Sequence, residues 1–345
     1  MSLHSEILEQ PACLERLLSS QRKIVEEIAA AIQSRDIQFA FLAARGTSDN
    51  AGRYANYLWG AMNGLPLALA TPSLFTYYKQ PPKLKNALVV GISQSGQSPD
   101  IVSVLQEGKH QGNLTLAITN EPNSPLAQEA DFVLEIEAGP ELAVAATKTY
   151  TTELMAIAML STALAGDSTR WDELGQVAGW VEMALRSDEI IQQAAQRYRY
   201  MQNCVVLGRG FNYATAFEWA LKLKELTYIE AEPYSSADFK HGPVAMVAQG
   251  FPVMAIAPDG KVLDTMLDLL SHLKKDLLAE LVVISNTDIA LSMAQTAFVI
   301  PEGIPEWLSP LVGIVPAQLF AYHLTMAKGY DADQPRTISK VTETK

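Results

Sequence analysis

The sequence repeats itself at a spacing of about 165 residues. The segment FLAARGTSDNAGRYANYL aligns with VVLGRGFNYATAFEWALK, which places the Arg-Gly pair at 45–46 opposite the Arg-Gly pair at 209–210. Further along, LAITN at 116–120 matches VVISN at 282–286. Because these matches keep the same order and nearly the same offset, the chain is predicted to be a duplicated structural unit.

Each half alternates short apolar runs with longer segments of helical periodicity. In the first half the apolar runs are IQFAFLAA, NALVVGIS, NLTLAIT and DFVLEIE, and a helical pattern follows each of them. This alternation is typical of βα units around a mostly parallel sheet flanked by helices, so the fold class is predicted to be α/β with two tandem domains. The expected parts are an N-terminal helix at 1–34, a first domain at 35–167, a connecting helix at 168–200, a second domain at 201–330 and a packed C-terminal tail at 331–345.

Composition excludes several classes of protein. With 48% apolar and 19% charged residues the chain reads as globular, and a net charge of −12 argues against nucleic acid or an anionic membrane surface as partner. The apolar stretches are broken well before about 18 residues, so no membrane span is expected. The polar, acidic N-terminus does not resemble a signal peptide, which favours the cytoplasm. Cys13 and Cys204 lie in unlike contexts and no cluster has ligand spacing, so neither a metal nor a cofactor is expected.

A hydroxyl-rich loop follows the second apolar run. It reads SQSGQSPD, with Ser93, Ser95 and Ser98 and no cation. In parallel sheets, ligands bind beyond the carboxyl ends of strands, where helix N-termini attract anions without a cation. We therefore predict a phosphate or sugar-phosphate site, with Ser98 as the N-cap and Pro99 as the first helical residue. The alternative is an ordinary turn in which Ser98 only caps a helix.

The turn RGTSDN has the same character one strand away. Thr47 and Ser48 lead into a helix for which Ser48 or Asp49 is the expected N-cap. Capping alone would account for one of these residues. Two hydroxyl-rich turns at neighbouring strand ends favour a shared pocket for a polyol or a phosphate.

The second half carries the candidates for acid and base chemistry. Lys222 and Glu225 are three residues apart on a helix that is apolar on most sides, so we expect one of these charges to be drawn inward. A half-buried carboxylate there is a candidate proton shuttle, although a solvated ion pair is the common alternative. His241, in the loop KHGP, is either a positioned acid or base or simply exposed. Lys340 is either a structural lysine of the tail or an amine presented to a carbonyl.

Six segments, taken in order, resemble the sugar isomerase (SIS) domains of glutamine-dependent glucosamine-6-phosphate synthases, which are built of two tandem SIS domains. These segments are RGTS, SQSGQS, VAATKTYTTEL, LGRGFNYATAFEWALKLKELTYIEAE, KHGP and DQPRTISK. The resemblance implies a sugar-phosphate ligand, bound by a phosphate loop and a sugar-lining set: Ser93, Gln94, Ser95 and Ser98, with Thr47, Ser48 and Val144. It also implies four catalytic residues: Glu225 as the isomerising base with Lys222 beside it, His241 for ring opening, supplied by the adjacent subunit of a homodimer, and Lys340 for a Schiff base.

Three departures from that family shape the expected reaction. The 345 residues hold no counterpart of the synthases' glutaminase domain, Gln97 stands where the synthases usually have Glu, and Arg45 replaces a smaller residue. The resemblance therefore implies a stand-alone SIS-type deaminase that converts glucosamine-6-phosphate to fructose-6-phosphate and ammonia, with gluco and galacto substrates both open. One alternative is a deglycase of a 6-phosphorylated fructosamine, whose carboxylate Arg45 could suit. The other is a non-catalytic sugar-phosphate-binding SIS protein.

Overall fold

The computed structural model describes residues 2–340, and the chain divides into two compact units. Both units are assembled from segments that are not contiguous in the sequence, because the chain passes between them several times. Within the described residues, unit 1 comprises 2–11, 142–147 and 177–338, and unit 2 comprises 12–141, 148–176 and 339–340.

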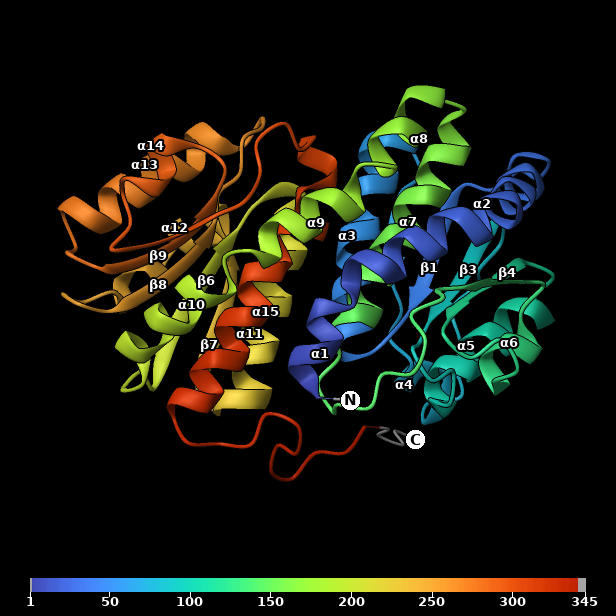
Figure 1. Ribbon diagram of the computed structural model, residues 1–345. Helices are drawn as coiled ribbons and strands as arrows, with labels where there is room; N and C mark the ends of the chain where they lie inside the picture. The colour runs from blue at the N-terminus through green and yellow to red at the C-terminus, as the bar shows by residue number, and fades with distance from the viewer. Residues whose placement is uncertain (1, 341–345) are drawn as a thin grey trace. The chain divides into compact units, whose positions relative to one another are not determined.

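Unit 2 contains a five-stranded sheet in which all the paired strands are parallel (Figure 1). The order across the sheet is β2-β1-β3-β4-β5, so the chain reverses its direction of growth between β2 and β3. Each six-residue apolar run at the centre of the sheet is buried over its whole length, as expected for strands covered on both faces. The strands are β1 (Phe39–Ala43), β2 (Leu67–Leu69), β3 (Ala87–Ile92), β4 (Leu114–Thr119) and β5 (Phe132–Glu135).

Helices cover both faces of this sheet. On one face, Phe41, Val89 and Ala117 from the strands pack with Ile101 and Leu105 from the helix that follows β3. Alternate strand residues point to the opposite face. There α3 (Gly46–Asn63) and α7 (Lys148–Ala165) pack against each other. The helices are α2 (Gln10–Gln33), α3 (Gly46–Asn63), α4 (Ser73–Thr76), α5 (Pro99–His110), α6 (Pro125–Glu129), α7 (Lys148–Ala165) and α8 (Ser168–Leu174).

Unit 1 contains a second parallel five-stranded sheet, in the order β10-β9-β8-β6-β7. On one face of this sheet, Val205, Val253 and Leu281 from the strands form a hydrophobic core with Leu269 and Leu273 from the helix that follows β8. The strands are β6 (Asn203–Gly208), β7 (Glu230–Ser235), β8 (Pro252–Ile256), β9 (Glu280–Ser285) and β10 (Thr296–Val299).

The helices of unit 1 range from single short turns to the long helices α11 and α15 (Figure 1). The two long helices α11 and α15 pack against each other, with the rings of Trp219 and Phe320 edge to face at 6.0 Å. The helices are α1 (Leu3–Leu8), α9 (Val177–Leu185), α10 (Asp188–Ala195), η1 (Gln196–Tyr198), η2 (Gly210–Asn212), α11 (Tyr213–Thr227), α12 (Ser236–Lys240), η3 (Pro243–Met246), α13 (Leu263–Lys275), α14 (Asp288–Leu291), η4 (Glu306–Leu308) and α15 (Ser309–Ala327).

The two sheets have the same topology. Read from β7, the second sheet runs β7-β6-β8-β9-β10, which matches β2-β1-β3-β4-β5 strand for strand. The Arg-Gly pairs at 45–46 and 209–210 both follow the strand in second position, and their glycines begin α3 and η2. The predicted duplication and the α/β fold with two tandem domains are therefore confirmed.

The segments expected to be single helices at 1–34 and 168–200 are each divided. The first is α1 and α2, where α1 begins with a capping box formed by Ser2 and Ser5. The second is α8, α9, α10 and η1. Gly175, a poor helix former, follows α8, and Asp188 begins α10, where an acidic side chain suits a helix N-terminus.

One segment, Glu306–Ala327, is long and apolar enough by composition to cross a membrane, contrary to the expectation from the sequence that no segment would be. However, 83% of its most apolar window is buried inside the folded chain. It is thus the core helix α15, whose even apolarity reflects contact with protein on all sides.

Candidate functional site

The loop after β3 is a tight turn held by its own hydroxyls and by the next strand. Ser93 Oγ accepts a hydrogen bond from the Gly96 amide at 3.1 Å, and Ser95 Oγ accepts one from the Gln97 amide at 3.3 Å. The carbonyl of Gln94 accepts hydrogen bonds from the hydroxyl of Thr119, the last residue of β4, and from the amide of Asn120. The predicted phosphate loop is therefore a defined structure at the carboxyl end of the sheet.

Gly96 can be nothing but glycine in this turn. Its φ is +60°, and a Cβ placed there would lie 2.0 Å from Ser124 Oγ. Its carbonyl also accepts a hydrogen bond from the Leu126 amide at 3.1 Å. The close approach of the loop to the start of α6 thus depends on the missing side chain.

The helix after this loop begins where the sequence predicted, but without the expected cap. Ser98 occupies the N-cap position before Pro99, yet its side chain makes no capping hydrogen bond. Asp100 Oδ1 instead accepts from the Ile101 amide at 2.9 Å. The reading of Ser98 as a side-chain cap is wrong, and its half-buried hydroxyl is not used for capping.

The turn after β1 also differs from its predicted form. The helix α3 begins at Gly46 with Arg45 as N-cap, so Ser48 and Asp49 lie in the first turn and neither is the cap. Gly46 has a φ of +53° and is the first helical residue, so the helix begins earlier than a cap at Ser48 or Asp49 would place it. Ser48 is buried and donates to Glu153 Oε1 at 2.8 Å, which leaves its oxygen as an acceptor, while Thr47 is half-buried.

Arg45 connects the two turns. Its Nε donates to Asp100 Oδ2 at 2.7 Å, and the Asp100 side chain is only 1% exposed while that of Arg45 is 49% exposed. A cation is therefore held at the N-termini of α3 and α5 by a buried carboxylate. Burial raises the pKa of Asp49 in the same turn, an effect that the neighbouring Arg53 and Arg45 oppose.

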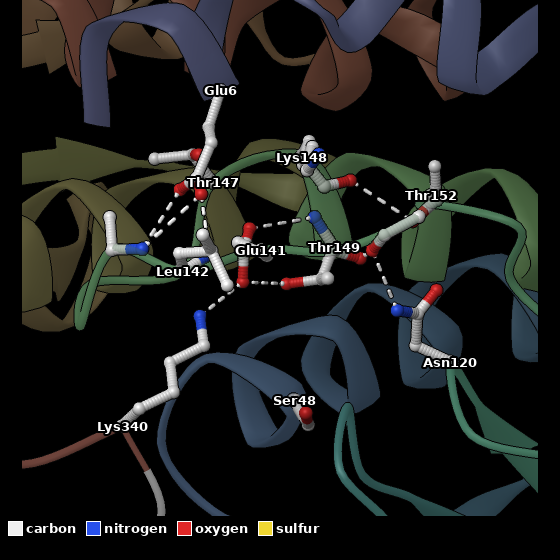
Figure 2. Close-up of polar contacts among 12 residues, drawn as sticks. Glu6, Ser48, Asn120, Glu141, Leu142, Thr147, Lys148, Thr149, Thr152 and Lys340 are labelled. Carbon is white, nitrogen blue, oxygen red and sulfur yellow. Dashed lines mark hydrogen bonds and ion pairs between the residues drawn. The ribbon is translucent and has the colours of Figure 1, made fainter. Parts of the chain in front are cut away.

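The tail lysine contacts a buried carboxylate in unit 2. Lys340 Nζ lies 2.6 Å from Glu141 Oε2, and Figure 2 shows the amine pointing at this group. Glu141 is fully buried as a side chain and also accepts from the amide and the hydroxyl of Thr149, at 3.2 and 2.8 Å. Because Thr149 lies in the first turn of α7, the carboxylate fixes Lys340 to that end of the helix.

Val144, expected in the sugar site with Thr47 and Ser48, belongs to the segment 142–147 of unit 1. This segment is held by Glu6, whose carboxylate accepts from the amide of Ala143 at 3.2 Å and from that of Leu142. Val144 is half-buried.

The acid and base candidates on α11 form a charged cluster inside unit 1. Lys222 is 1% exposed, and its Nζ lies 3.4 Å from Glu218 and 2.6 Å from Glu225. Glu218 is fully buried, while the Glu225 side chain is 26% exposed. The expectation that one charge is drawn inward is confirmed, and the surface-pair alternative is wrong for Lys222. A partly exposed carboxylate beside a buried ammonium has the accessibility that a proton-transfer group needs.

His241 ends the short helix α12 and is exposed. The Ser235 hydroxyl caps this helix by accepting from the Ala237 amide at 3.3 Å, and Gly242 follows with φ of +140°. The turn is thus defined by its backbone, and the imidazole is presented to the outside of unit 1.

Three acidic residues that pair with Lys340, Arg45 and Lys222 were not predicted from the sequence. Glu141 and Asp100 are buried partners of Lys340 and Arg45, and Glu218 is the second partner of Lys222. Only Glu218 carried a usable signal, because it lies four residues before Lys222 on a predicted helix.

Comparisons with known proteins agree with this architecture. The model of the SIS domain family matches residues 35–163 and 200–328. The glutamine–fructose-6-phosphate aminotransferase (isomerizing) of Thermococcus kodakarensis is 36% identical over 344 residues, a match that covers 97% of this chain and 56% of that protein. The chain therefore spans little more than half the length of the curated relatives it matches.

Solved structures show the same two-sheet arrangement. The C-terminal domain of glucosamine-fructose-6-phosphate aminotransferase from Francisella tularensis has a TM-score of 0.84 and 30% identity, covering 96% of this chain and 98% of that one. Glucosamine-6-phosphate deaminase from Thermotoga maritima has a TM-score of 0.75 at 21% identity, covering 98% of this chain and 100% of that one, and this likeness is one of fold.

Proposed function

Because the chain belongs to the SIS domain family, we propose that it binds a sugar phosphate and moves a proton between C1 and C2 of an amino-sugar 6-phosphate. The substrate is glucosamine-6-phosphate, and the products are fructose-6-phosphate and ammonia. The observation that carries this proposal is the Glu225 carboxylate, partly exposed and 2.6 Å from the buried Lys222 ammonium.

The loop at 93–98 binds the 6-phosphate. Ser95 and Ser98 are half-buried and offer hydroxyls, and the helix dipole of α5 favours an anion at this end. Arg45 adds a cation at the same strand ends, and its contact with Asp100 limits its movement. The site therefore does not rely on uncharged donors alone, as the composition of the loop by itself suggested.

Glu225 is the base. In the open-chain aldose it takes the proton from C2, which produces a C1–C2 enolamine, and returns a proton to C1. The product is an imine at C2, which water hydrolyses to the ketose and ammonia. Lys222 holds the carboxylate in place through their 2.6 Å contact.

Lys340 engages the C2 carbon of the keto or imino intermediate. A lysine attacks such a carbon as a neutral amine, so its ion pair with Glu141 has to open before attack. Until then, the buried carboxylate holds Lys340 at the first turn of α7.

His241 assists ring opening and acts in the neighbouring subunit of a homodimer, as the resemblance implies. Its exposure and the defined turn around it suit a residue that reaches another chain. Mixing the inactive variants His241→Asn and Glu225→Gln should then restore activity, because some heterodimers have one intact pair. No restoration on subunit exchange, or an active monomer in sedimentation, argues against sharing.

The reaction is tested with the purified full chain. With glucosamine-6-phosphate we expect ammonia and fructose-6-phosphate in equal amounts, and exchange of the C2 proton with deuterated solvent. Glu225→Gln should lower kcat by at least about 100-fold, the range of a general base. Glu232→Gln, an exposed glutamate on β7, is the matched control and should be silent. If Glu225→Gln keeps full activity, the assigned base is wrong.

A fructosamine 6-phosphate deglycase is the second candidate, and the observation that favours it is Arg45. Its guanidinium is half-exposed while Asp100 holds it, which suits the carboxylate of an amino-acid adduct. A panel of glucosamine-6-phosphate, galactosamine-6-phosphate and a 6-phosphorylated fructosamine of an amino acid separates the candidates. Turnover of the fructosamine alone, lost in Arg45→Ala, would replace the deaminase proposal.

A further inference from the structure

Two histidines and one aspartate meet in unit 1 from three different helices. His4 lies in α1, Asp188 is the first residue of α10, and His323 lies in α15. The Nε2 atom of His4 is 2.8 Å from one oxygen of Asp188, and that of His323 is 2.6 Å from the other. The three candidate ligand atoms all lie within 4.8 Å of one another.

Packing fixes the orientation of both imidazoles. The ring of His4 stacks on that of Tyr322 with 4.8 Å between centroids and 11° between planes. The ring of His323 meets His4 at 5.8 Å and Tyr322 at 5.0 Å, both edge to face. His323 is buried, while His4 and Asp188 are each about a quarter exposed. The two Nε2 atoms are thus already aimed at one carboxylate before any ligand enters.

We propose that His4, Asp188 and His323 bind a late first-row divalent metal ion, of which Zn²⁺ is the best match. Two imidazole nitrogens and one carboxylate oxygen form a donor set that suits this ion, at distances of about 2.0–2.2 Å. A tetrahedral ion needs its donor atoms about 3.4 Å apart, whereas the three candidate donor atoms now lie within 4.8 Å of one another, so binding requires only a small adjustment of the two rings and the carboxylate. On binding, each Nε2 coordinates without a proton and Nδ1 carries the remaining one.

A cavity beside the cluster leaves room for a further ligand. It has a volume of about 350 Å³ and is lined by the three residues with Gln192, Gln196, Tyr322 and Met326. A water molecule from this cavity can complete a four-coordinate site, and the cavity is the path by which the ion enters. Binding would clamp α1 to α10 and α15, which lie far apart in the sequence.

The test uses the full chain without an affinity tag, stripped with a chelator and titrated with Zn²⁺ against a chromophoric competitor. We expect one tight site per chain, and at 100-fold excess over Kd a rise in the Tm of unit 1 on the order of 7 °C. Co²⁺ should give the visible bands of a four-coordinate ion. His4→Gln and Asp188→Asn should each weaken Zn²⁺ binding by at least about 10-fold.

The control is His272→Gln. His272 forms a similar contact, at 2.7 Å to Asp276, but both residues are exposed and lie on one helix turn, so the variant should bind Zn²⁺ as the native protein does. His4→Gln is the main variant, because His4 is partly exposed on a short helix and its loss is compatible with folding. The proposal is overturned if the folded protein binds no Zn²⁺ more tightly than about 1 mM, or if His4→Gln leaves the affinity unchanged.

Discussion

Replacing Lys222 with methionine should destabilise unit 1. The loss in free energy of unfolding should exceed that of Lys224→Met or Lys340→Met. The ammonium is 1% exposed and lies 3.4 Å from Glu218, which is fully buried. Methionine keeps most of the volume of the side chain but removes its charge. The variant therefore leaves the buried Glu218 carboxylate without the Lys222 ammonium.

The magnitude follows from these distances. Unit charges 3.4 Å apart attract by about 5 kcal/mol at an effective dielectric constant of about 20. Desolvation offsets much of that attraction, but removing one partner of a buried pair typically costs about 3–5 kcal/mol, because the other charge remains buried. The pair with Glu225 adds less, since that carboxylate is partly exposed. We expect a loss of about 4 kcal/mol and a fall in Tm on the order of 10 °C.

Chemical denaturation followed by circular dichroism and by tryptophan fluorescence measures the change. Trp219, buried on the same helix, reports on unit 1. Lys224→Met is the matched control, because Lys224 is exposed two residues away and its loss should cost under about 0.5 kcal/mol. The double variant Lys222→Met/Glu218→Gln removes both charges and should recover at least about 1 kcal/mol.

Two results would refute this reasoning. A cost below about 1 kcal/mol for Lys222→Met would mean that the pair contributes no more than a surface ion pair. Equal stability of the single and double variants would mean that the buried carboxylate of Glu218 is not the source of the lost stability.

Three further substitutions test the loops and the tail. Gly96→Ala should cost at least about 2 kcal/mol and abolish sugar-phosphate binding, whereas Gly112→Ala, also at positive φ but with open space around it, should cost about 1 kcal/mol and keep binding. Lys340→Met should stop turnover while sugar-phosphate binding persists, and it should destabilise unit 2 by about 1–3 kcal/mol because the buried Glu141 loses its ion pair with Lys340; retained turnover would exclude a Schiff base. The raised pKa of Asp49 means that its ionised form disfavours folding. Asp49→Asn should therefore be more stable than the native protein at pH 7, and this advantage should vanish as the pH falls below 3.8. A stability advantage that grows on acidification would contradict this reasoning.

Much of the architecture was predictable from the sequence, because it depends on neighbours along the chain. Apolar runs of strand length between helical periods specify βα units, and the repeat at about 165 residues specifies two of them in tandem. The hydroxyl-rich loop at 93–98 lies in the turn from β3 to α5, as the apolar run before it and the helical pattern after it predict. Helix starts were less accurate: α3 begins at Gly46, where backbone conformation rather than a hydroxyl cap sets the boundary.

The tertiary structure alone decided which charges meet when they lie far apart in the sequence. Lys340 and Glu141 are separated by 199 positions, and Arg45 and Asp100 by 55, so no local pattern pairs them. The cluster of His4, Asp188 and His323 likewise escaped a search for ligand spacing, since three separate helices supply it.

The physical reason is the range over which each effect acts. Turn geometry and hydrophobic periodicity involve residues a few positions apart, and the order of amino acids states them directly. An ion pair or a ligand set acts over a few ångströms of space, and only the packing of strands and helices converts distant positions into such distances. For this protein the sequence by itself determined the duplicated α/β fold and the loop proposed to bind phosphate. The folded chain determined the carboxylate partners that hold Arg45 and Lys340 in place.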